Sequence, residues 1–200
     1  MRRFPQEFEA KKEVLFYPRR PDKFSADILE IGPGRGDFIL STATACPEKK
    51  LVAIELDKKR YAKIIPRMEK QGLFNILLIQ GNARVVLPKY FQPGTFEKIY
   101  VLFPDPWPKK RHIPHRLLSV EFIRILKTLL RPGGDFFVAT DFWSYADWVT
   151  DNLRQFEDLE SRGKPFFITS DQMSHYRPSV FEEKWRSENR AIYYLHYKKL

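Results

Sequence analysis

The sequence predicts an α/β protein with a mostly parallel central sheet, helices on both faces of that sheet and an antiparallel strand from the C-terminal segment. Short apolar runs, of the length expected for buried strands, alternate along the chain with stretches whose apolar residues recur at helical spacing. Such alternation builds βαβ units with right-handed crossovers, and helices then cover both faces of the sheet. The final apolar run, residues 191–198, is expected to pair antiparallel at one side of the sheet.

The predicted elements follow one another along the chain without a linker that would separate two domains. Strands are expected at residues 27–31, 51–56, 75–80, 98–103 and 135–140, and helices at residues 37–46, 58–71, 117–130 and 145–156. Pro66 must kink or shorten the second helix, because proline lacks the backbone N–H that a helix interior requires. The sequence Arg-Pro-Gly-Gly at residues 131–134 stops the third helix. Residues 1–24, rich in charge and proline, are predicted to form an irregular basic arm before one domain, residues 25–200.

The composition indicates a basic globular protein. Lysine and arginine outnumber aspartate and glutamate, 35 to 25, which gives a net charge of +10 and a surface that attracts polyanions. No apolar stretch approaches the roughly 18–20 residues that a spanning helix needs, so no membrane partner is expected. The single cysteine, Cys46, cannot form an internal disulfide, which fits a reducing, cytoplasmic compartment. The histidines lack metal-ligand spacing, so no metal is expected, and no obligatory protein partner is inferred.

A glycine-rich loop follows the first predicted strand. Gly32, Gly34 and Gly36 allow a tight turn and the close approach of a ligand to the backbone. Ligands of parallel sheets bind beyond the carboxyl ends of the strands, where this loop lies. Its third glycine comes one residue earlier than in the dinucleotide-binding fingerprint. The resulting G-x-G-x-G spacing is similar to that of Rossmann-like methyltransferases, although a glycine turn that serves only packing explains the motif alone equally well.

Polar side chains at three successive strand ends favour a ligand over packing. Glu30 precedes the glycine loop and could receive a cationic amino group. Glu55 ends the second strand, where a carboxylate can accept hydrogen bonds from both hydroxyls of a ribose. Asn82 follows the third strand and could pair with an adenine edge. S-adenosylmethionine carries an ammonium and a sulfonium, so this acidic set predicts it as the cofactor, with S-adenosylhomocysteine as the product.

A proline-rich loop, FPDPWPKKRH at residues 103–112, follows the fourth predicted strand. Its three prolines are expected to keep it extended and stiff. The loop would present Asp105, Trp107 and a run of basic side chains at the edge of the sheet. Aromatic faces stack on bases and cations neutralise phosphates, so these residues could bind a nucleic acid.

This loop, together with EIGPGRGDF, Gly-Asn-Ala at residues 81–83 and Ala-Thr-Asp at residues 139–141, resembles the bacterial-type tRNA (guanine-N7-)-methyltransferases. The resemblance covers most of the chain and implies a Rossmann-like, S-adenosylmethionine-dependent methyltransferase that acts on guanine N7 in the variable loop of tRNA. It implies cofactor contacts from Glu30, Glu55, Asn82 and Asp105, with Asp105 catalytic. It also implies substrate contacts from Lys109, Asp141, Ser179, Val180, Phe181 and Glu182.

Guanine N7 has an in-plane lone pair, so methyl transfer to it requires alignment rather than removal of a proton. Asp105 is therefore expected to orient the substrate and stabilise the charge that develops on the purine. Lys110, Arg111 and Arg116 are predicted to contact RNA phosphates. The aromatic residues Trp143 and Trp148 are expected to belong to the core instead.

The chain departs from the family pattern in three places. Ser179 replaces a threonine, residues 113–115 interrupt the basic run, and residues 184–189 replace a glycine-bearing stretch. Two alternatives therefore stay open. One is a methyltransferase of the same fold that acts on another RNA, and the other is a catalytically idle RNA-binding subunit.

Overall fold

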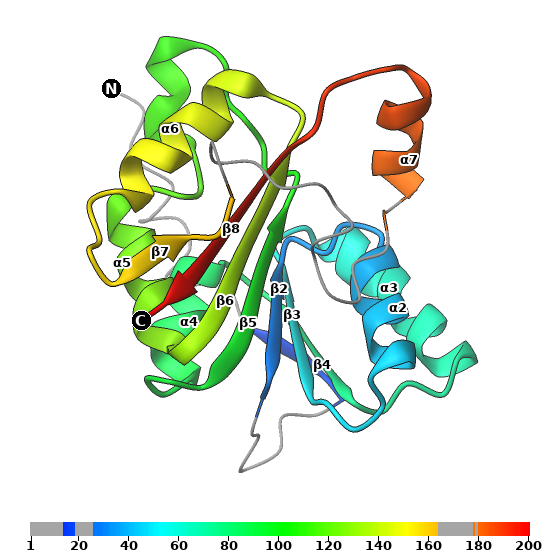
Figure 1. Ribbon diagram of the computed structural model, residues 1–200. Helices are drawn as coiled ribbons and strands as arrows, with labels where there is room; N and C mark the ends of the chain where they lie inside the picture. The colour runs from blue at the N-terminus through cyan, green and yellow to red at the C-terminus, as the bar shows by residue number, and fades with distance from the viewer. Residues whose placement is uncertain (1–13, 19–25, 164–177, 179) are drawn as a thin grey trace.

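The computed structural model describes residues 14–18, 26–163, 178 and 180–200 (Figure 1). Their strands form one sheet of eight, in the order β1-β4-β3-β2-β5-β6-β8-β7. The strands are β1 (Leu15–Tyr17), β2 (Ile28–Ile31), β3 (Leu51–Glu55), β4 (Ile76–Gln80), β5 (Phe96–Leu102), β6 (Leu130–Thr140), β7 (Leu159–Ser161) and β8 (Tyr193–Lys199). The five central strands are parallel, while β1, β8 and β7 pair antiparallel. The predicted mostly parallel sheet and its antiparallel C-terminal strand are confirmed.

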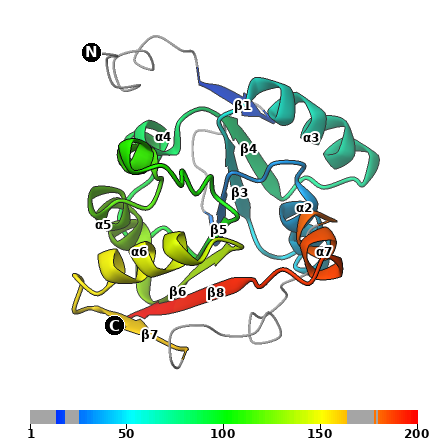
Figure 2. The same ribbon diagram turned by 90° about the horizontal axis from the view of Figure 1, so that it is seen from above.

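Helices cover both faces of this sheet. They are α2 (Asp37–Ala45), α3 (Lys58–Lys70), α4 (Ala83–Tyr90), α5 (Val120–Leu129), α6 (Trp143–Leu153) and α7 (Val180–Ser187), with a 3₁₀ helix η1 at Lys110–His115. Figure 2 shows α4, α5 and α6 on one side of the sheet, and α2 and α3 on the other. Helix α7 lies beyond the carboxyl ends of the parallel strands, above α2 and α3 in Figure 1.

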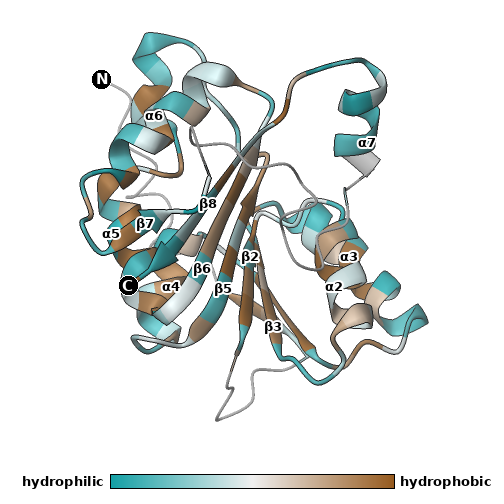
Figure 3. Ribbon diagram, in the orientation of Figure 1, coloured by the Kyte–Doolittle hydropathy of each residue, from teal (hydrophilic) through white to brown (hydrophobic). Residues whose placement is uncertain are grey.

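Alternation along the strands divides the core into two layers. In β2, Leu29 and Ile31 face the layer under α4, α5 and α6, whereas Ile28 faces the layer under α2 and α3. Figure 3 shows that the central strands are mostly apolar along their length, and β2, β3 and β4 are buried at every position because a parallel sheet is covered on both sides. Consecutive residues of a strand therefore pack into opposite layers of the core, and a polar side chain at a strand end likewise lies on one face of the sheet.

The strand order reverses between β2 and β5, which are parallel neighbours. The chain leaves β2 into α2 on one face, and after β5 it continues into α5 on the other face. Loops at such a reversal diverge and leave room for a ligand between them. The glycine loop and the proline loop are the two loops in question.

Several elements differ from the sequence-based expectation. Leu15–Tyr17 forms β1 and pairs with β4, so part of the predicted irregular arm belongs to the sheet. Helix α3 continues to Lys70, so Pro66 does not shorten it. Residues 131–134 end α5 as predicted, but they enter β6, where the β5–β6 register shifts between Phe96 and Lys98. Helices α4 and α7 and strand β7, which are only eight, eight and three residues long, were not predicted.

The described helices include none that is long and apolar enough to cross a membrane.

Removal of the Phe16 side chain tests the contribution of β1. Its ring packs edge-on against Tyr90 at 5.2 Å between centroids. We expect Phe16→Ala to lower the free energy of unfolding by about 1–2 kcal/mol, because a partly buried aromatic ring is lost. Denaturant unfolding measures the change. Phe74→Ala is the matched control: Phe74 is 87% exposed, and its removal should change stability by less than about 0.5 kcal/mol. Equal effects of the two variants would show that the Phe16 ring adds nothing to stability.

Candidate active site

The glycine loop joins β2 to α2 at the reversal of the sheet. Gly32 and Gly34 adopt positive φ angles, +75° and +59°, and a side chain at either position would point into open space. Gly36 differs, because a Cβ there would lie 3.2 Å from Ile64 of α3. The first two glycines therefore expose backbone to a ligand, while the third allows α2 and α3 to pack closely. The loop geometry thus accounts for helix packing at Gly36 and leaves Gly32 and Gly34 open to a ligand.

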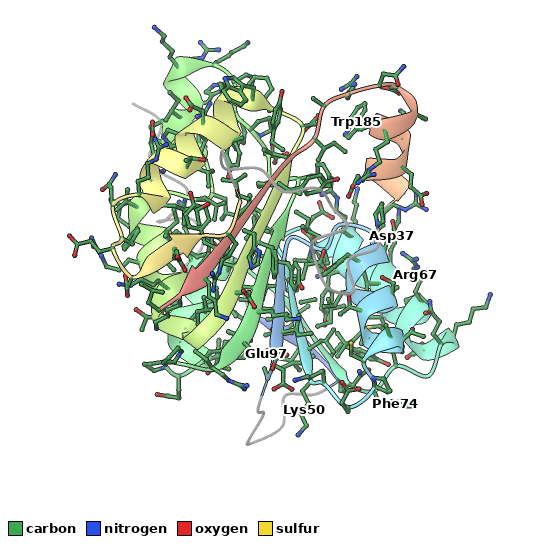
Figure 4. All side chains as sticks on the ribbon, in the orientation of Figure 1. Asp37, Lys50, Arg67, Phe74, Glu97 and Trp185 are labelled. Atoms are coloured by element: carbon green, nitrogen blue, oxygen red, sulfur yellow. The ribbon has the colours of Figure 1, made fainter. Side chains whose placement is uncertain are left out.

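Glu55 fixes the shape of this loop from the end of β3. Its Oε2 accepts a hydrogen bond from the backbone N–H of Gly34 at 3.0 Å, and its Oε1 accepts one from Asp57 at 2.8 Å. The residue is only 4% exposed. A carboxylate has about four acceptor positions, so Glu55 can still receive further donors such as ribose hydroxyls. Arg67 also contacts the loop, through the carbonyl of Arg35 and an ion pair with Asp37 at 2.9 Å (Figure 4).

Glu30 is a buried carboxyl group behind the glycine loop. It is 2% exposed, and among the described residues its Oε2 has no hydrogen-bond partner. Burial and the nearby Glu55 raise the pKa of Glu30 to about 8. A buried oxygen without a hydrogen-bond partner is costly. A cationic group would give this oxygen a partner and would offset its repulsion with Glu55. The residues present therefore fit the ammonium group of S-adenosylmethionine.

Asn82 caps α4 directly after β4. Its side-chain oxygen accepts a hydrogen bond from the backbone N–H of Arg84 at 2.9 Å. Asn82 is partly exposed at this strand end, and its side-chain oxygen caps the helix. Glu30, Glu55 and Asn82 thus lie at the ends of three adjacent parallel strands, as the sequence predicted.

The proline loop leaves β5 beside the glycine loop and is not extended throughout. Phe103 and Trp107 adopt left-handed backbone conformations, with φ of 51° and 42°. Such conformations are uncommon for bulky residues, and they bend the loop twice. Asp105 lies between the bends and is exposed. Lys109, Lys110 and Arg111 are exposed where η1 begins, in agreement with their predicted access to a polyanion.

Arg116 is placed differently from its prediction as a phosphate contact. It is only 4% exposed, and its Nε donates a hydrogen bond to the carbonyl of Pro106 at 3.0 Å. Its guanidinium lies over the rings of Tyr145 at 5.6 Å and Trp148 at 5.1 Å. Arg84 in turn donates to the carbonyl of Arg116 at 2.8 Å. Arg116 thus holds the proline loop against α6. The sequence does not predict this role, because a hydrogen bond to a backbone carbonyl requires no particular residue spacing.

The structure places some of the predicted substrate residues after β6 and describes others only in part. Asp141 follows β6 at the site and lies 3.9 Å from Arg190. Glu182 is fully buried in α7, where Arg186 donates to it at 2.9 Å and the hydroxyl of Tyr194 also donates to it. Glu182 therefore anchors α7 to β8 and is not open to a substrate in this arrangement, in contrast to its prediction. Ser179 lies outside the described residues, and Val180 and Phe181 begin α7, without a description of their side chains.

Two tryptophans lie exposed at this edge. Trp107 is 37% exposed and contacts His112 and His115, each with 5.4 Å between ring centroids. Trp143 is 54% exposed at the start of α6, so its assignment to the core was wrong. The prediction rested on its position within or beside a helix, but the first turn of a helix can project beyond the layer that its later turns cover. Within the described part of the chain, no cluster of acidic, histidine or cysteine side chains could bind a metal ion.

Comparisons with known proteins agree with this geometry. A family model described as "Putative methyltransferase" matches residues 25–195. The crystal structure of the 16S rRNA methyltransferase KamB superposes with a TM-score of 0.61 at 18% identity, covering 88% of each chain. The structure of TrmN from Thermus thermophilus gives 0.61 at 19% identity, covering 88% of this chain and 44% of that one. Fold and site thus define a methyltransferase of the Rossmann-like class, with S-adenosylmethionine as its cofactor.

More similar relatives identify the family. A tRNA (guanine-N(7)-)-methyltransferase of Syntrophotalea carbinolica is 33% identical over 172 residues, covering 86% of this chain and 73% of the relative. The enzyme of the same name from Geobacter metallireducens is 34% identical over 175 residues, covering 86% and 81%. The chain belongs to the tRNA (guanine-N(7)-)-methyltransferase family.

The raised pKa of Glu30 predicts that cofactor binding releases a proton. Near pH 7 the carboxyl group is mostly protonated, and an ammonium group favours its ionised form. Binding of S-adenosylhomocysteine should therefore be about tenfold tighter at pH 7 than at pH 6. Calorimetry in buffers of different ionisation enthalpy measures the proton release. Glu30→Gln should bind weakly with no release, while Glu157→Gln, at an exposed carboxyl, should behave as wild type. A pH-independent wild-type affinity would contradict the assignment.

The position of Arg116 predicts a loss of stability when it is shortened. We expect Arg116→Ala to lower the free energy of unfolding by about 1–3 kcal/mol, because the Pro106 carbonyl and two aromatic rings lose their buried partner. Arg111→Ala, at an exposed site of the same loop, should change it by less than about 0.5 kcal/mol. Denaturant titration compares the two. Unchanged stability of the Arg116 variant would show that these buried contacts do not stabilise the fold.

Proposed function

We propose that this protein transfers the methyl group of S-adenosylmethionine to N7 of a guanine in the variable loop of tRNA. The observation that carries the proposal is the position of Asp105 and Lys109. Both belong to the proline loop that follows β5. Strand β5 pairs with β2, which carries Glu30 and leads into the glycine loop. Two relatives named above bear the name of this reaction and cover most of the chain.

S-adenosylmethionine supplies an electrophilic methyl group on a positively charged sulfur. Glu30, Glu55 and Asn82 bind its amino-acid and nucleoside parts, and the exposed backbone of Gly32 and Gly34 allows it to lie close to the loop. These residues fix the methyl donor relative to the end of β5. Their contribution is positional, since alignment of the reacting atoms accounts for several kcal/mol of such a barrier.

Asp105 acts on the acceptor side. As the N7 lone pair bonds to the methyl carbon, the carbon–sulfur bond would break and its electron pair would stay on sulfur as a neutral thioether. The guanine would then carry the positive charge, which a nearby carboxylate stabilises. No proton has to leave N7, so Asp105 orients and stabilises rather than acting as a base. The exposed cations Lys109, Lys110 and Arg111 neutralise phosphates, which brings a polyanion to the loop. A tRNA substrate also agrees with the net charge of +10, and it implies a cytoplasmic protein.

Incubation with unmodified tRNA and methyl-labelled cofactor, followed by nucleoside analysis, tests the proposal. The expected product is 7-methylguanosine in the variable loop. Label in another nucleoside, or label only in ribosomal RNA supplied in parallel, would replace the proposal by the same-fold alternative. Cofactor binding without transfer to any RNA would favour the idle RNA-binding subunit.

Asp105→Asn should lower turnover by about 10²–10³-fold, because a neutral amide cannot stabilise the charge that develops on the purine. Affinity for tRNA should change little, since the carboxylate matters most as the bond forms. Single-turnover kinetics with saturating tRNA measure the effect. Asp147→Asn, at an exposed carboxylate on α6, is the control and should keep wild-type turnover. A fully active Asp105 variant would remove this residue from the reaction.

A further inference from the structure

Exposed apolar side chains concentrate at the edge of the sheet that carries the site. Among the described residues, the large apolar side chains with high exposure are Leu56, Phe74, Val85, Trp107, Trp143 and Leu200. Four of these follow the carboxyl ends of four parallel strands: Leu56 after β3, Val85 after β4, Trp107 after β5 and Trp143 after β6. Phe74 lies at the opposite end of the sheet (Figure 4). An aromatic ring exposed at the edge that carries the site offers a face on which a base can stack.

Among the described aromatic side chains at this edge, Trp143 is the most exposed, with 54% of its surface accessible. Its indole contacts Tyr193 at 5.3 Å between centroids and 65° between planes, so the two rings meet at an angle rather than in a stack. Tyr193 lies opposite Thr140 at the last pair of the β6–β8 ladder. The platform formed by Trp143 and Tyr193 is therefore supported by regular structure at both of its attachment points, and a rigid aromatic surface binds at a low cost in conformational entropy.

The surroundings of this platform favour a base over a phosphate. Asp141, two residues before Trp143, lies 3.9 Å from Arg190. Arg190 also lies 3.1 Å from a carboxylate oxygen of Glu188 and 3.6 Å from the ring centroid of Trp185. Two carboxylates thus oppose the one guanidinium, and this part of the edge attracts a phosphate less than the exposed Lys109, Lys110 and Arg111 do. Aromatic faces bind single-stranded bases by stacking, independently of phosphate neutralisation.

We propose that Trp143, supported by Tyr193, stacks on an unpaired base of the RNA substrate that flanks the methylated guanine. The inference rests on the proposed function for its substrate class. It assigns base stacking to β6 and α6, and phosphate binding to the proline loop after β5. The two contacts have different signatures, because only neutralisation of phosphates releases counterions and depends on salt.

Equilibrium binding of unmodified tRNA to the full chain loaded with S-adenosylhomocysteine, measured over a range of salt concentrations, tests the proposal. Trp143→Ala should raise the Kd by about 5–100-fold, the range that loss of one stacked base gives, with the slope of log Kd against log salt unchanged. Trp143→Phe should stay within about threefold of wild type. Lys110→Ala should instead reduce the slope by about one. Phe74→Ala, which removes an exposed aromatic ring from the opposite edge, should leave both quantities unchanged.

Trp143→Leu separates stacking from folding and from simple apolar contact. It keeps apolar volume at the start of α6 but has no aromatic face, so its affinity should fall as in the alanine variant while its unfolding free energy stays near wild type. Wild-type affinity in the alanine or leucine variant would overturn the proposal. A reduced salt slope in either would also overturn it, because it would show a phosphate contact.

Product analysis distinguishes failure of this inference from failure of the proposed function. If Trp143→Ala binds tRNA and forms 7-methylguanosine as wild type does, the stacking proposal fails and the function stands. If the variant weakens binding but wild type forms no 7-methylguanosine, the function fails and the RNA contact stands. A wild-type protein that does not bind tRNA would overturn both.

Discussion

The parallel pairing of β2 with β5 is the constraint on which the candidate site depends. These neighbouring strands end at the same edge of the sheet, but the chain continues from them to opposite faces. Their two loops must therefore diverge, and the ligands of both loops meet between them. The glycine loop provides exposed backbone, and the proline loop provides Asp105 and a basic run. Neither loop could form the site alone. The glycine loop lacks a charged group for the methyl acceptor, and the proline loop lacks the exposed glycine backbone that the methyl donor would approach.

Charge is distributed over this edge in two separate ways. Glu30 and Glu55 are buried, so their mutual repulsion is poorly screened, and a bound cation stabilises the pair. Lys109, Lys110 and Arg111 are exposed, where they attract a long polyanion and cost little in desolvation. A small cofactor with a net positive charge and a large polyanionic substrate can thus bind at adjacent places without competition. Burial rather than sequence distance separates the two electrostatic environments.

Arginine side chains connect the strand ends mechanically. Arg84, which follows β4, holds the carbonyls of Arg116 and Leu117, and Arg116 holds the carbonyl of Pro106 after β5. The same guanidinium packs on Tyr145 and Trp148 of α6, which follows β6. Three successive crossovers are therefore coupled through the proline loop. This arrangement accounts for the stable bends at Phe103 and Trp107, since the surrounding contacts compensate for their unfavourable backbone angles.

The sequence by itself determined the order of the central elements and the chemistry at their ends. Buried strands need continuous apolar runs, so β2 to β6 could be predicted. Glu30, Glu55, Asn82 and Asp105 were then candidates because they lie at or just beyond the ends of those runs. The family motif identified the reaction for the same reason, since it lies within one continuous loop. Local periodicity and contiguous motifs are properties of neighbouring residues, and they need no knowledge of the fold.

Only the tertiary structure decided which side chains remain accessible. Arg116 and Arg111 are five residues apart in one basic loop, yet one is buried under α6 and the other is exposed. Glu182 was expected at the substrate and is buried against Tyr194, whereas Trp143 was expected in the core and lies at the surface. Strand β1 joined the sheet through pairing with β4, far along the chain. Burial and long-range pairing depend on what other segments cover, and that information is absent from the residues themselves.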